Sequence, residues 1–418
     1  MAKSVLSPSN LDFLMRKRSK KILMLLENNC FPNDTRVLLE ARSLVEGGFD
    51  VTVISPTGSY TKWSDWVGDV KVYRYPAPPE WNGVLGYVVE YAYSFCMALL
   101  ISIYVLFRRG FDAIHVHSPP DLNSLIPFLY RALGKKSVFD MHDLSPELYQ
   151  AQKGGQANGL LISGLRFFER FACRWGHKLI STNQTQRSVQ IDRCGADATK
   201  CHIVRNGPNK LFLEDVQPSL EVYDDKLTIG YVGLIGFQDG VDYLVRAIAA
   251  LKRMRASGEE LPGFQCVIVG DGPAMPELRK LVSELQVSNE IVFAGMVDFS
   301  DVPSYISAFD VCVTPDPSNP YNDSCTTIKT MEYMALRKPI VCFETHENRV
   351  TAGEAALYAR DSDCKDLARQ IAILLSDPEM RHTMGQIGRT RIENGLTWSH
   401  QAVELVALYQ ELLISEPK

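Results

Sequence analysis

The chain has 418 residues, of which 46% are hydrophobic and 22% are charged, a composition typical of a globular protein with two or three domains. Its formal net charge of −5 argues against nucleic-acid binding, which usually needs a basic surface, so we expect no nucleic-acid partner. The ten cysteines are far apart and include no C-x-x-C pair. This spacing argues against a disulfide scaffold or a zinc site and favours reduced thiols in the cytoplasm.

The first part of the chain predicts an α/β domain. Residues 1–20 lack the apolar core of a signal peptide, and we expect them to form a basic arm. Strand-like and helix-like segments then alternate up to residue 206, which predicts a parallel sheet with helices on both faces. The strands predicted within this domain, 21–206, are 21–26, 50–55, 70–75, 113–117, 136–141, 177–182 and 201–206, with helices at 34–48 and 120–133.

A long apolar segment, residues 84–107, interrupts the alternation and carries a single formal charge, Glu90. Its length alone makes it a candidate transmembrane helix. The strands predicted on either side argue against a span, because one sheet would then be divided across a bilayer. Polar residues also recur at helical spacing along the segment. We therefore expect a long helix that is mostly buried or lies at a membrane interface, with a true span as the alternative.

The second half of the chain predicts a second domain of the same kind. Residues 207–226 are polar, contain two prolines and are expected to form a linker. Two doubly wound domains that face each other form a cleft, because ligands bind beyond the carboxyl ends of the strands. The second domain, 227–395, has predicted strands at 227–233, 264–270, 290–295, 310–315 and 339–343 and helices at 240–256 and 274–285, and an amphipathic helix at 396–418 is expected to cross back to the first domain.

The stretch NDSCTTIKTMEYMALRKPIV, residues 322–341, is typical of a helix that leads into a buried strand. A helix N-terminus attracts phosphate, Thr326 and Thr327 add hydroxyl groups, and Lys329 adds a positive charge. Glu332 follows on the same face, where its carboxylate could accept both hydroxyls of a ribose. The stretch thus predicts a nucleoside-diphosphate site. The alternative is a surface helix with an ordinary ion pair between Lys329 and Glu332.

Two glycine-bearing turns follow predicted strands at the same edge of the second sheet. One contains Gly233 and Gly236 in VGLIGFQDG, and the other contains Gly270, Asp271 and Gly272 in VGDGP. Glycine lets a backbone pass close to a ligand, so we expect both turns to bind the donor. The alternative is that each glycine serves only the conformation of its turn.

In these motifs the chain from about residue 21 onward resembles glycosyltransferase family 4, the retaining sugar-nucleotide enzymes of the GT-B architecture. It is most similar to the bacterial enzymes of exopolysaccharide and O-antigen assembly. The resemblance implies two doubly wound Rossmann-like domains, a nucleoside-diphosphate sugar donor with UDP favoured over GDP, and a glycan or polyprenyl-diphosphate-linked acceptor. It also implies a cytoplasmic protein with peripheral contact to the inner face of the membrane through residues 84–109. Besides the motifs above, the resemblance is clearest in NNCFPNDTRVLLEARSLVEGGFDVTVI, FDAIHVHSPPDLNSLIP, DMHDLSPELY and VRNGPN.

The family's C-terminal signature is a pair of glutamates separated by seven residues. Glu332 matches the second glutamate, which the resemblance implies to be the ribose ligand. The first position is Ser324 here, so we expect Asp316 or Asp323 to take its place near the donor sugar.

Two cations that the family commonly places after the first strand of this domain are missing, because that loop has Leu234 and then Gln238 or Asp239. We expect Lys329 and Arg205 to neutralise the diphosphate in their place.

In the first domain, His142 matches the family's histidine after the fifth strand, which is implied to contact the donor sugar or the charge that develops at its anomeric carbon. We expect Asp143 to orient His142, and His117 to flank the acceptor. A helix cap at Asn33 or Asp34 is the alternative to acceptor binding there. The remaining expected acceptor contacts are Asn33, Asp34 and Arg36.

The resemblance implies front-face attack assisted by the leaving phosphate, supported here by His142, Lys329 and Glu332. We expect no cofactor and no metal, and we interpret the DSD run at residues 361–363 as a helix cap. Two alternatives stay open, a GT-B sugar-nucleotide 2-epimerase and a non-catalytic sugar-nucleotide-binding protein. A nicotinamide oxidoreductase is disfavoured, because no G-x-G-x-x-G follows the first strand.

Overall fold

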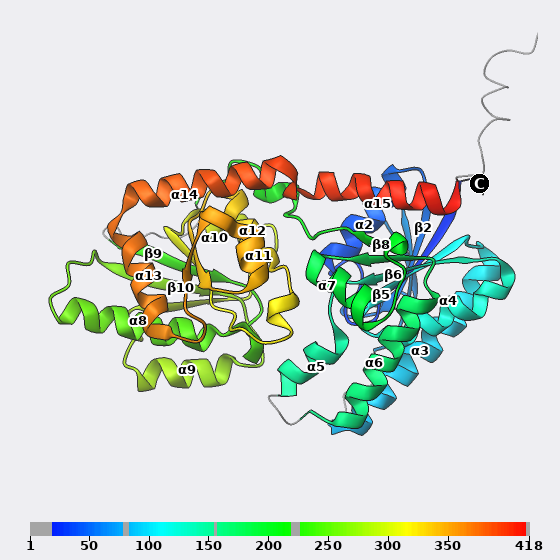
Figure 1. Ribbon diagram of the computed structural model, residues 1–418, viewed down its shortest axis with the longest axis horizontal. Coiled ribbons are helices and arrows are strands. Elements are labelled where there is room, and N and C mark those ends of the chain that lie inside the picture. The colour runs from blue at the N-terminus through cyan, green and yellow to red at the C-terminus, as the bar shows by residue number, and fades with distance from the viewer. Residues whose placement is uncertain (1–18, 78–82, 154–156, 219–225, 415–418) are drawn as a thin grey trace, which may run out of the picture.

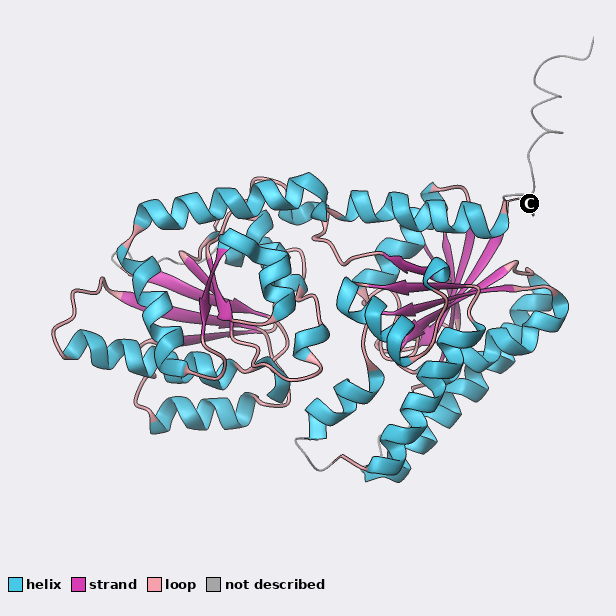
Figure 2. Ribbon diagram, in the orientation of Figure 1, coloured by secondary structure: helices cyan, strands magenta, loops and turns pink. Residues whose placement is uncertain are grey.

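The computed structural model describes residues 19–77, 83–153, 157–218 and 226–414. It consists of two α/β domains placed side by side, each a sheet covered by helices on both faces (Figures 1 and 2). The predicted fold class, two doubly wound Rossmann-like domains, is confirmed.

The first sheet has the strand order β3-β4-β2-β1-β5-β6-β7-β8 among the described residues. Its strands pair in parallel except for β3, which is antiparallel to β4 and which the sequence analysis did not predict. The chain order reverses between β1 and β5, so the carboxyl ends of these two strands border the ligand-binding edge. The strands are β1 (Lys21–Leu25), β2 (Asp50–Pro56), β3 (Ser64–Val67), β4 (Val70–Tyr75), β5 (Ala113–Ser118), β6 (Lys136–Met141), β7 (Lys178–Ser181) and β8 (Cys201–Ile203).

Alternating side chains divide the core of this domain between the two faces of the sheet. In β1, Ile22 and Met24 pack on the face that α2 and α15 cover, whereas Leu23 and Leu25 pack on the face that α3, α4 and α6 cover. Apolar residues on both faces explain why the strands read as continuous hydrophobic runs. The helices are α2 (Thr35–Glu46), α3 (Gly83–Arg108), α4 (Leu125–Tyr130), α5 (Ser145–Lys153), α6 (Gly159–Trp175) and α7 (Gln184–Ser188), and α15 is Trp398–Leu413.

The long helix α3 buries only one side. Ala98, Ile101 and Val105, at helical spacing, pack into the core, whereas Leu100 and Phe107 are 62% and 82% exposed. The segment Val88–Arg108 is long and apolar enough to cross a membrane by length and composition, and 28% of its most apolar window is buried. The helix thus belongs to the sheet domain and presents an apolar outer face.

The second sheet has the order β11-β10-β9-β12-β13-β14, with all its described strands parallel. Its chain order reverses between β9 and β12, which places the ligand-binding edge at their carboxyl ends. The elements are β9 (Leu227–Val232), α8 (Val241–Ala256), β10 (Phe264–Val269), α9 (Met275–Glu284), β11 (Ile291–Gly295), α10 (Val302–Ser307), β12 (Val311–Thr314), α11 (Ile328–Ala335), β13 (Ile340–Phe343), α12 (His346–Ala352), β14 (Ala356–Ala359), α13 (Cys364–Ser376) and α14 (Pro378–Arg391).

The segments that join the domains also belong to their cores. Within the expected linker, Phe212 is fully buried in the core of the second domain. After α14, the π-helical turn η9 (Ile392–Leu396) leads into α15, which lies on the first domain beside α2 (Figure 1). The indole nitrogen of Trp398 donates a hydrogen bond to Ser43 Oγ at 2.9 Å. The prediction that the C-terminal helix crosses back is therefore confirmed.

Leu405 tests how much this helix stabilises the first domain. Its side chain is fully buried in the core formed with α2, so Leu405→Ala should lower the free energy of unfolding by about 2–5 kcal/mol. Denaturant unfolding followed by circular dichroism measures the change. Val403 lies in the same helix and is 67% exposed, so Val403→Ala is the matched control and should change stability by less than about 0.5 kcal/mol. Equal effects of the two substitutions would contradict the packing of α15.

Candidate functional site

A cavity of about 430 Å³ opens at the carboxyl ends of β9 and β10 in the second domain. Thr35 from the first domain also lines it, so the cavity lies between the two domains. The predicted donor residues that line it are Gly233, Gly270, Thr327, Lys329 and Glu332. Apolar side chains complete the wall, among them Met296, Val297 and Phe299. A polar end and an apolar wall are typical of a small-molecule site.

The N-terminus of α11 borders this cavity. Thr327 is the N-cap residue with an extended backbone, and its hydroxyl makes no capping hydrogen bond within the described chain. The first amides of a helix have no partner within the helix, so amides at this end can donate to a ligand. The loop between β12 and α11, including the short turn η7 (Asn322–Ser324), brings this helix end to the edge of the sheet.

Lys329 is buried and surrounded by acidic groups. Its Nζ lies 2.9 Å from Asp316 Oδ1 and 3.4 Å from Asp239 Oδ1, and it donates to the Tyr231 hydroxyl at 3.2 Å. Burial disfavours the charged ammonium, but Asp316, Tyr231 and Asp239 together hold the pKa of Lys329 well above its usual value. The lysine is therefore charged, and two carboxylates already balance it. Of the two expected substitutes for the family's first glutamate, Asp316 is thus the one that contacts the site.

Glu332 lies one turn further along α11 and is 8% exposed. Burial raises the pKa of its carboxyl to about 7, with Lys329 opposing the shift. A carboxyl that lines a cavity and ionises near neutral pH can accept two hydroxyl groups of a ligand when it is charged. The position agrees with the role that the sequence analysis expects for this residue.

The glycine turns pack against each other. Gly270 has a φ of +129°, and a Cβ there would lie 1.9 Å from the carbonyl oxygen of Gly233. A Cβ on Gly272 would lie 2.5 Å from the carbonyl oxygen of Ile235. The conformational alternative therefore explains Gly270 and Gly272, although Gly233 and Gly270 also line the cavity.

Seven predicted donor residues lie outside the cavity lining: Gly272, Asp316, Thr326 and the four described next. The amide of Gly236 donates to Asp239 Oδ2, and Asp271 accepts from the amide of Gly272. Asp323 accepts from the Ser318 hydroxyl. The guanidinium of Arg205 donates to Thr351 Oγ1 in α12 at 3.2 Å.

His142 follows β6 in the first domain and is not among the residues that line this cavity. Its Nδ1 lies 3.3 Å from Asp140 Oδ2, and its side chain is 11% exposed. Burial opposes the charged imidazolium, but Asp140 outweighs it and raises the pKa of His142 to about 9. The expected orienting role of Asp143 is corrected, because Asp143 Oδ1 accepts instead from the Tyr321 hydroxyl at 3.1 Å. Asp140, which the sequence analysis did not single out, orients the histidine.

Three of the expected acceptor residues lie beneath the surface or serve the fold, whereas Asn33 is exposed. His117 has no exposed surface, so it does not flank an acceptor. Arg36 is 8% exposed and pairs with Asp140 and Glu40. Asp34 caps α2 through the amide of Val37, as the alternative proposed. Asn33 accepts from the Tyr60 hydroxyl at 3.2 Å.

Hydrogen bonds across the domain boundary hold the two domains together. Asn183 Nδ2 donates to the carbonyl of Ser324 at 2.8 Å and to Thr326 Oγ1 at 3.0 Å. The Thr185 hydroxyl donates to Glu347, and the contact between Tyr321 and Asp143 adds a third link. Thr326 thus connects the domains. Single polar residues in loops carry no periodic signal, so Asn183 and Tyr321 could not be identified from the sequence.

Comparison with known proteins is consistent with this arrangement. The family model described as "Glycosyl transferase 4-like domain" matches residues 34–207, and "Glycosyl transferases group 1" matches residues 226–377. Alpha-D-kanosaminyltransferase of Streptomyces kanamyceticus is 28% identical over 45% of this chain, which spans about half (47%) of that protein. 2-Deoxystreptamine glucosyltransferase of the same organism is 22% identical over 83% of this chain and 89% of its own length.

Solved structures share the fold. Sucrose-phosphate synthase from Thermosynechococcus elongatus superposes with a TM-score of 0.77 at 19% identity, over 95% of this chain and 100% of that one. The Anabaena protein HepE in complex with UDP and glucose gives a TM-score of 0.70 at 15% identity, over 94% of this chain and 100% of that one. At these identities the likeness shows the architecture alone.

Burial of Glu332 predicts a pH-dependent cost to stability. Folding raises the pKa of Glu332 from 4.5 to about 7. Between these pH values the folded state holds a proton that the unfolded state releases, so the free energy of unfolding falls as the pH rises from about 4.5 to 7. Glu332→Gln should therefore stabilise the protein at pH 8, by on the order of 3 kcal/mol, and much less at pH 4.5. Denaturant unfolding at both pH values measures the difference. Glu277→Gln, at an exposed carboxyl in α9, is the control, and a gain that does not depend on pH would contradict the burial of Glu332.

Proposed function

Because the chain belongs to the GT-B glycosyltransferases, we propose that it is a retaining, family 4-type hexosyltransferase that moves a sugar from a nucleoside-diphosphate sugar, UDP-linked in preference to GDP-linked, to a glycan or polyprenyl-diphosphate-linked acceptor in polysaccharide biosynthesis. The observation that carries the proposal is the cavity between the domains, where a helix N-terminus, Lys329 and Glu332 meet. A cytoplasmic location at the inner face of the membrane is part of the proposal.

The donor fits the cavity in a definite orientation. The diphosphate lies against the amides at the start of α11, because a helix N-terminus favours anions. The ribose reaches Glu332, whose ionised carboxylate accepts its hydroxyls. The sugar then points across the cleft to His142. The structures of HepE with UDP and glucose and with UDP-glucose support a UDP-sugar donor for a protein of this architecture.

Transfer of the sugar separates charge, and groups of the protein stabilise the charges that form. When the anomeric bond breaks, negative charge grows on the leaving diphosphate and positive charge on the sugar ring. Preorganised amides and the ammonium of Lys329 stabilise the first charge in a cavity with apolar walls. The acceptor hydroxyl attacks the anomeric carbon from the face that the diphosphate leaves, so the configuration is retained. The proton of the hydroxyl passes to the leaving phosphate oxygen. The His142 imidazolium contacts the sugar and fixes its position.

Donor binding is the direct test. Thermal unfolding with UDP-, GDP- and dTDP-sugars should show the largest rise in Tm with a UDP-sugar, because a ligand of the native state stabilises it by mass action. Lys329→Ala should weaken UDP binding in calorimetry at least tenfold, or about 1.4 kcal/mol, because a charge-assisted contact to the diphosphate is lost. Lys280→Ala, at an exposed lysine of α9, should leave the affinity unchanged.

No binding of any nucleotide sugar would overturn the proposed function, and unchanged UDP affinity of the Lys329 variant would overturn the role of that lysine. Product analysis with donor alone separates the alternatives. An epimerised sugar nucleotide would indicate a 2-epimerase, whereas binding without turnover in the presence of glycan and polyprenyl-diphosphate acceptors would indicate a non-catalytic binder.

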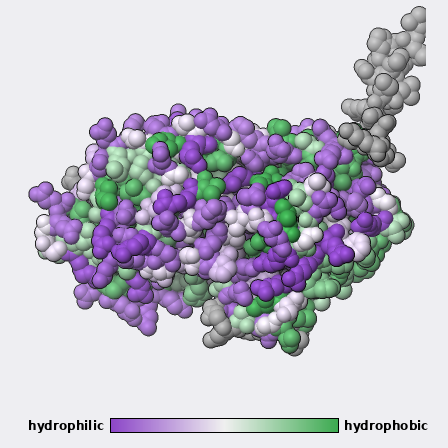
Figure 3. Space-filling view, in the orientation of Figure 1, coloured by the Kyte–Doolittle hydropathy of each residue, from purple (hydrophilic) through white to green (hydrophobic). Residues whose placement is uncertain are grey.

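The outer face of the first domain supports the proposed membrane contact. Exposed apolar side chains gather on α3, α4 and α6, on the lower right of the molecule in Figure 3. Arginines border them, among them Arg108 at the end of α3 and Arg131 after α4. Apolar side chains at a bilayer interface flanked by cations are typical of peripheral binding to anionic lipid. The most exposed apolar residues on these helices are Leu100, Phe107, Leu129, Leu160 and Phe167.

Vesicle cosedimentation tests this contact. The protein should bind vesicles that contain phosphatidylglycerol, and the double variant Leu100→Asp/Phe107→Asp should bind at least tenfold less tightly, because two apolar side chains leave the interface and two like charges enter. Val403→Asp is the control, since it changes an exposed apolar residue of α15 on the opposite side of the sheet. Equal loss in both variants, or no binding by the wild type at low salt, would contradict a membrane face on α3.

A further inference from the structure

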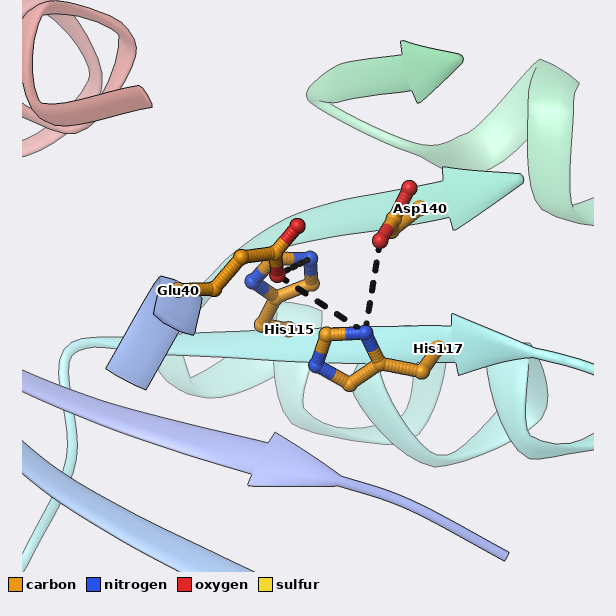
Figure 4. A group of neighbouring side chains, drawn as sticks. All are labelled: Glu40, His115, His117 and Asp140. Carbon is orange, nitrogen blue, oxygen red and sulfur yellow. Dashed lines mark ion pairs between the residues drawn. The ribbon is translucent and has the colours of Figure 1, made fainter. Parts of the chain in front are cut away.

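Four buried side chains beneath the cleft of the first domain converge on one point. Glu40 extends from α2, His115 and His117 extend from the same face of β5, and Asp140 lies opposite His117 on β6. All four have no exposed surface, and one ligating atom of each lies within 4.8 Å of the others. Figure 4 shows the two carboxylates and two imidazoles directed at one another.

Hydrogen bonding does not account for this arrangement. Both oxygens of Glu40 and both ring nitrogens of His115 and His117 are buried, yet none makes a hydrogen bond to any described residue. Glu40 Oε1 is ion-paired with Arg36, and the other five atoms remain. Buried polar atoms without a hydrogen bond cost about 1–3 kcal/mol each, so five in one place call for a bound group. The Tyr409 hydroxyl of α15, next to this cluster, is buried and unpaired as well, and its ring centroid lies 6.0 Å from that of His115.

The distances within the cluster suit ligands of a common ion. His115 Nε2 and His117 Nδ1 lie 3.7 and 3.8 Å from Glu40 Oε2. His117 Nδ1 lies 3.3 Å from Asp140 Oδ2. Two atoms bound tetrahedrally to Zn²⁺ at about 2.0–2.1 Å are about 3.3 Å apart, whereas hydrogen-bonded atoms are about 2.7–3.2 Å apart.

We propose that Glu40, His115, His117 and Asp140 bind a divalent transition-metal ion of the zinc class, which ties α2 to β5 and β6 and stabilises the first domain. Two imidazoles and two carboxylates are a ligand set that such ions accept. Burial lowers the pKa of both His115 and His117, which favours the neutral form that binds metal.

Arg36 holds the carboxylates in place for this site. Its guanidinium forms two hydrogen bonds to Asp140, at 2.8 and 3.0 Å, and lies 3.1 Å from Glu40 Oε1. It therefore cancels one of the two carboxylate charges and leaves Glu40 Oε2 facing the two histidines. Groups that orient metal ligands in this way commonly surround protein metal sites. The ion itself is too deep to reach a substrate, so its role is structural.

Cobalt binding to the full-length protein tests the proposal. After dialysis against a chelator, the wild type should take up one equivalent of Co²⁺ with the visible absorption of a four-coordinate ion, and Zn²⁺ should displace it. Mass spectrometry of the protein as purified should show one metal ion per chain, and metal removal should lower Tm. His117→Gln should weaken Co²⁺ binding at least tenfold, because one ligand is lost.

His382→Asn, which changes an exposed histidine of α14, should bind Co²⁺ as the wild type does. If His117→Gln does not fold, the wild-type measurements decide alone. No stoichiometric uptake and no change of Tm, or uptake that His117→Gln leaves unaltered, would overturn the site. UDP binding is measured separately, so failure here is distinguishable from failure of the proposed transferase.

Discussion

Asp140 is a fully buried carboxylate, and the first domain is organised around its charge. Burying an ionised carboxylate is costly unless charged or hydrogen-bonding groups surround it. Here Arg36 reaches it from α2, His117 from β5 and His142 from the cleft. The same residue therefore connects α2, two strands and the loop after β6. A change in any one of these elements would remove part of the compensation of its charge.

The second domain also buries a charged side chain, in this case a cation between carboxylates. Lys329 is a buried cation between Asp316 and Asp239, and Glu332 on the next turn keeps a raised pKa because it gains no such partner. Paired groups hold their positions, while the less compensated carboxyl faces the cavity. In the proposed donor site, Lys329 would therefore hold a fixed position, whereas the charge of Glu332 would depend on what binds beside it. The apolar wall of Met296, Val297 and Phe299 strengthens both electrostatic effects by excluding water.

The architecture was predictable because it depends on periodic patterns. Buried parallel strands read as apolar runs, so β1, β2, β4, β5 and β6 were found within a residue or so of their ends. The edge strand β3 was missed because its four residues are half-exposed and mixed in character. Glu332 and His142 were found from motifs that include their flanking strand or helix. Asp140 was missed because it lies in an apolar run. The contact of Arg205 with Thr351 was not predictable, because no sequence pattern gives the direction of a long side chain.

The two faces of the first sheet differ in what covers them, and this difference constrains how the two domains can move relative to each other. One face is closed by α2 and α15, so the C-terminal helix fastens the second domain to the side opposite α3. The apolar outer surface of α3 therefore lies on the opposite side of the sheet from the helix that joins the domains. A first domain held at a lipid surface through α3 would still be joined to the second domain through α15, residues 207–226, the contact of α5 with the turn at Phe237–Asp239, and the hydrogen bonds across the cleft. Polar hydrogen bonds of this kind break and re-form at lower cost than either core, which would let the proposed donor cavity open without moving the face that α3 presents.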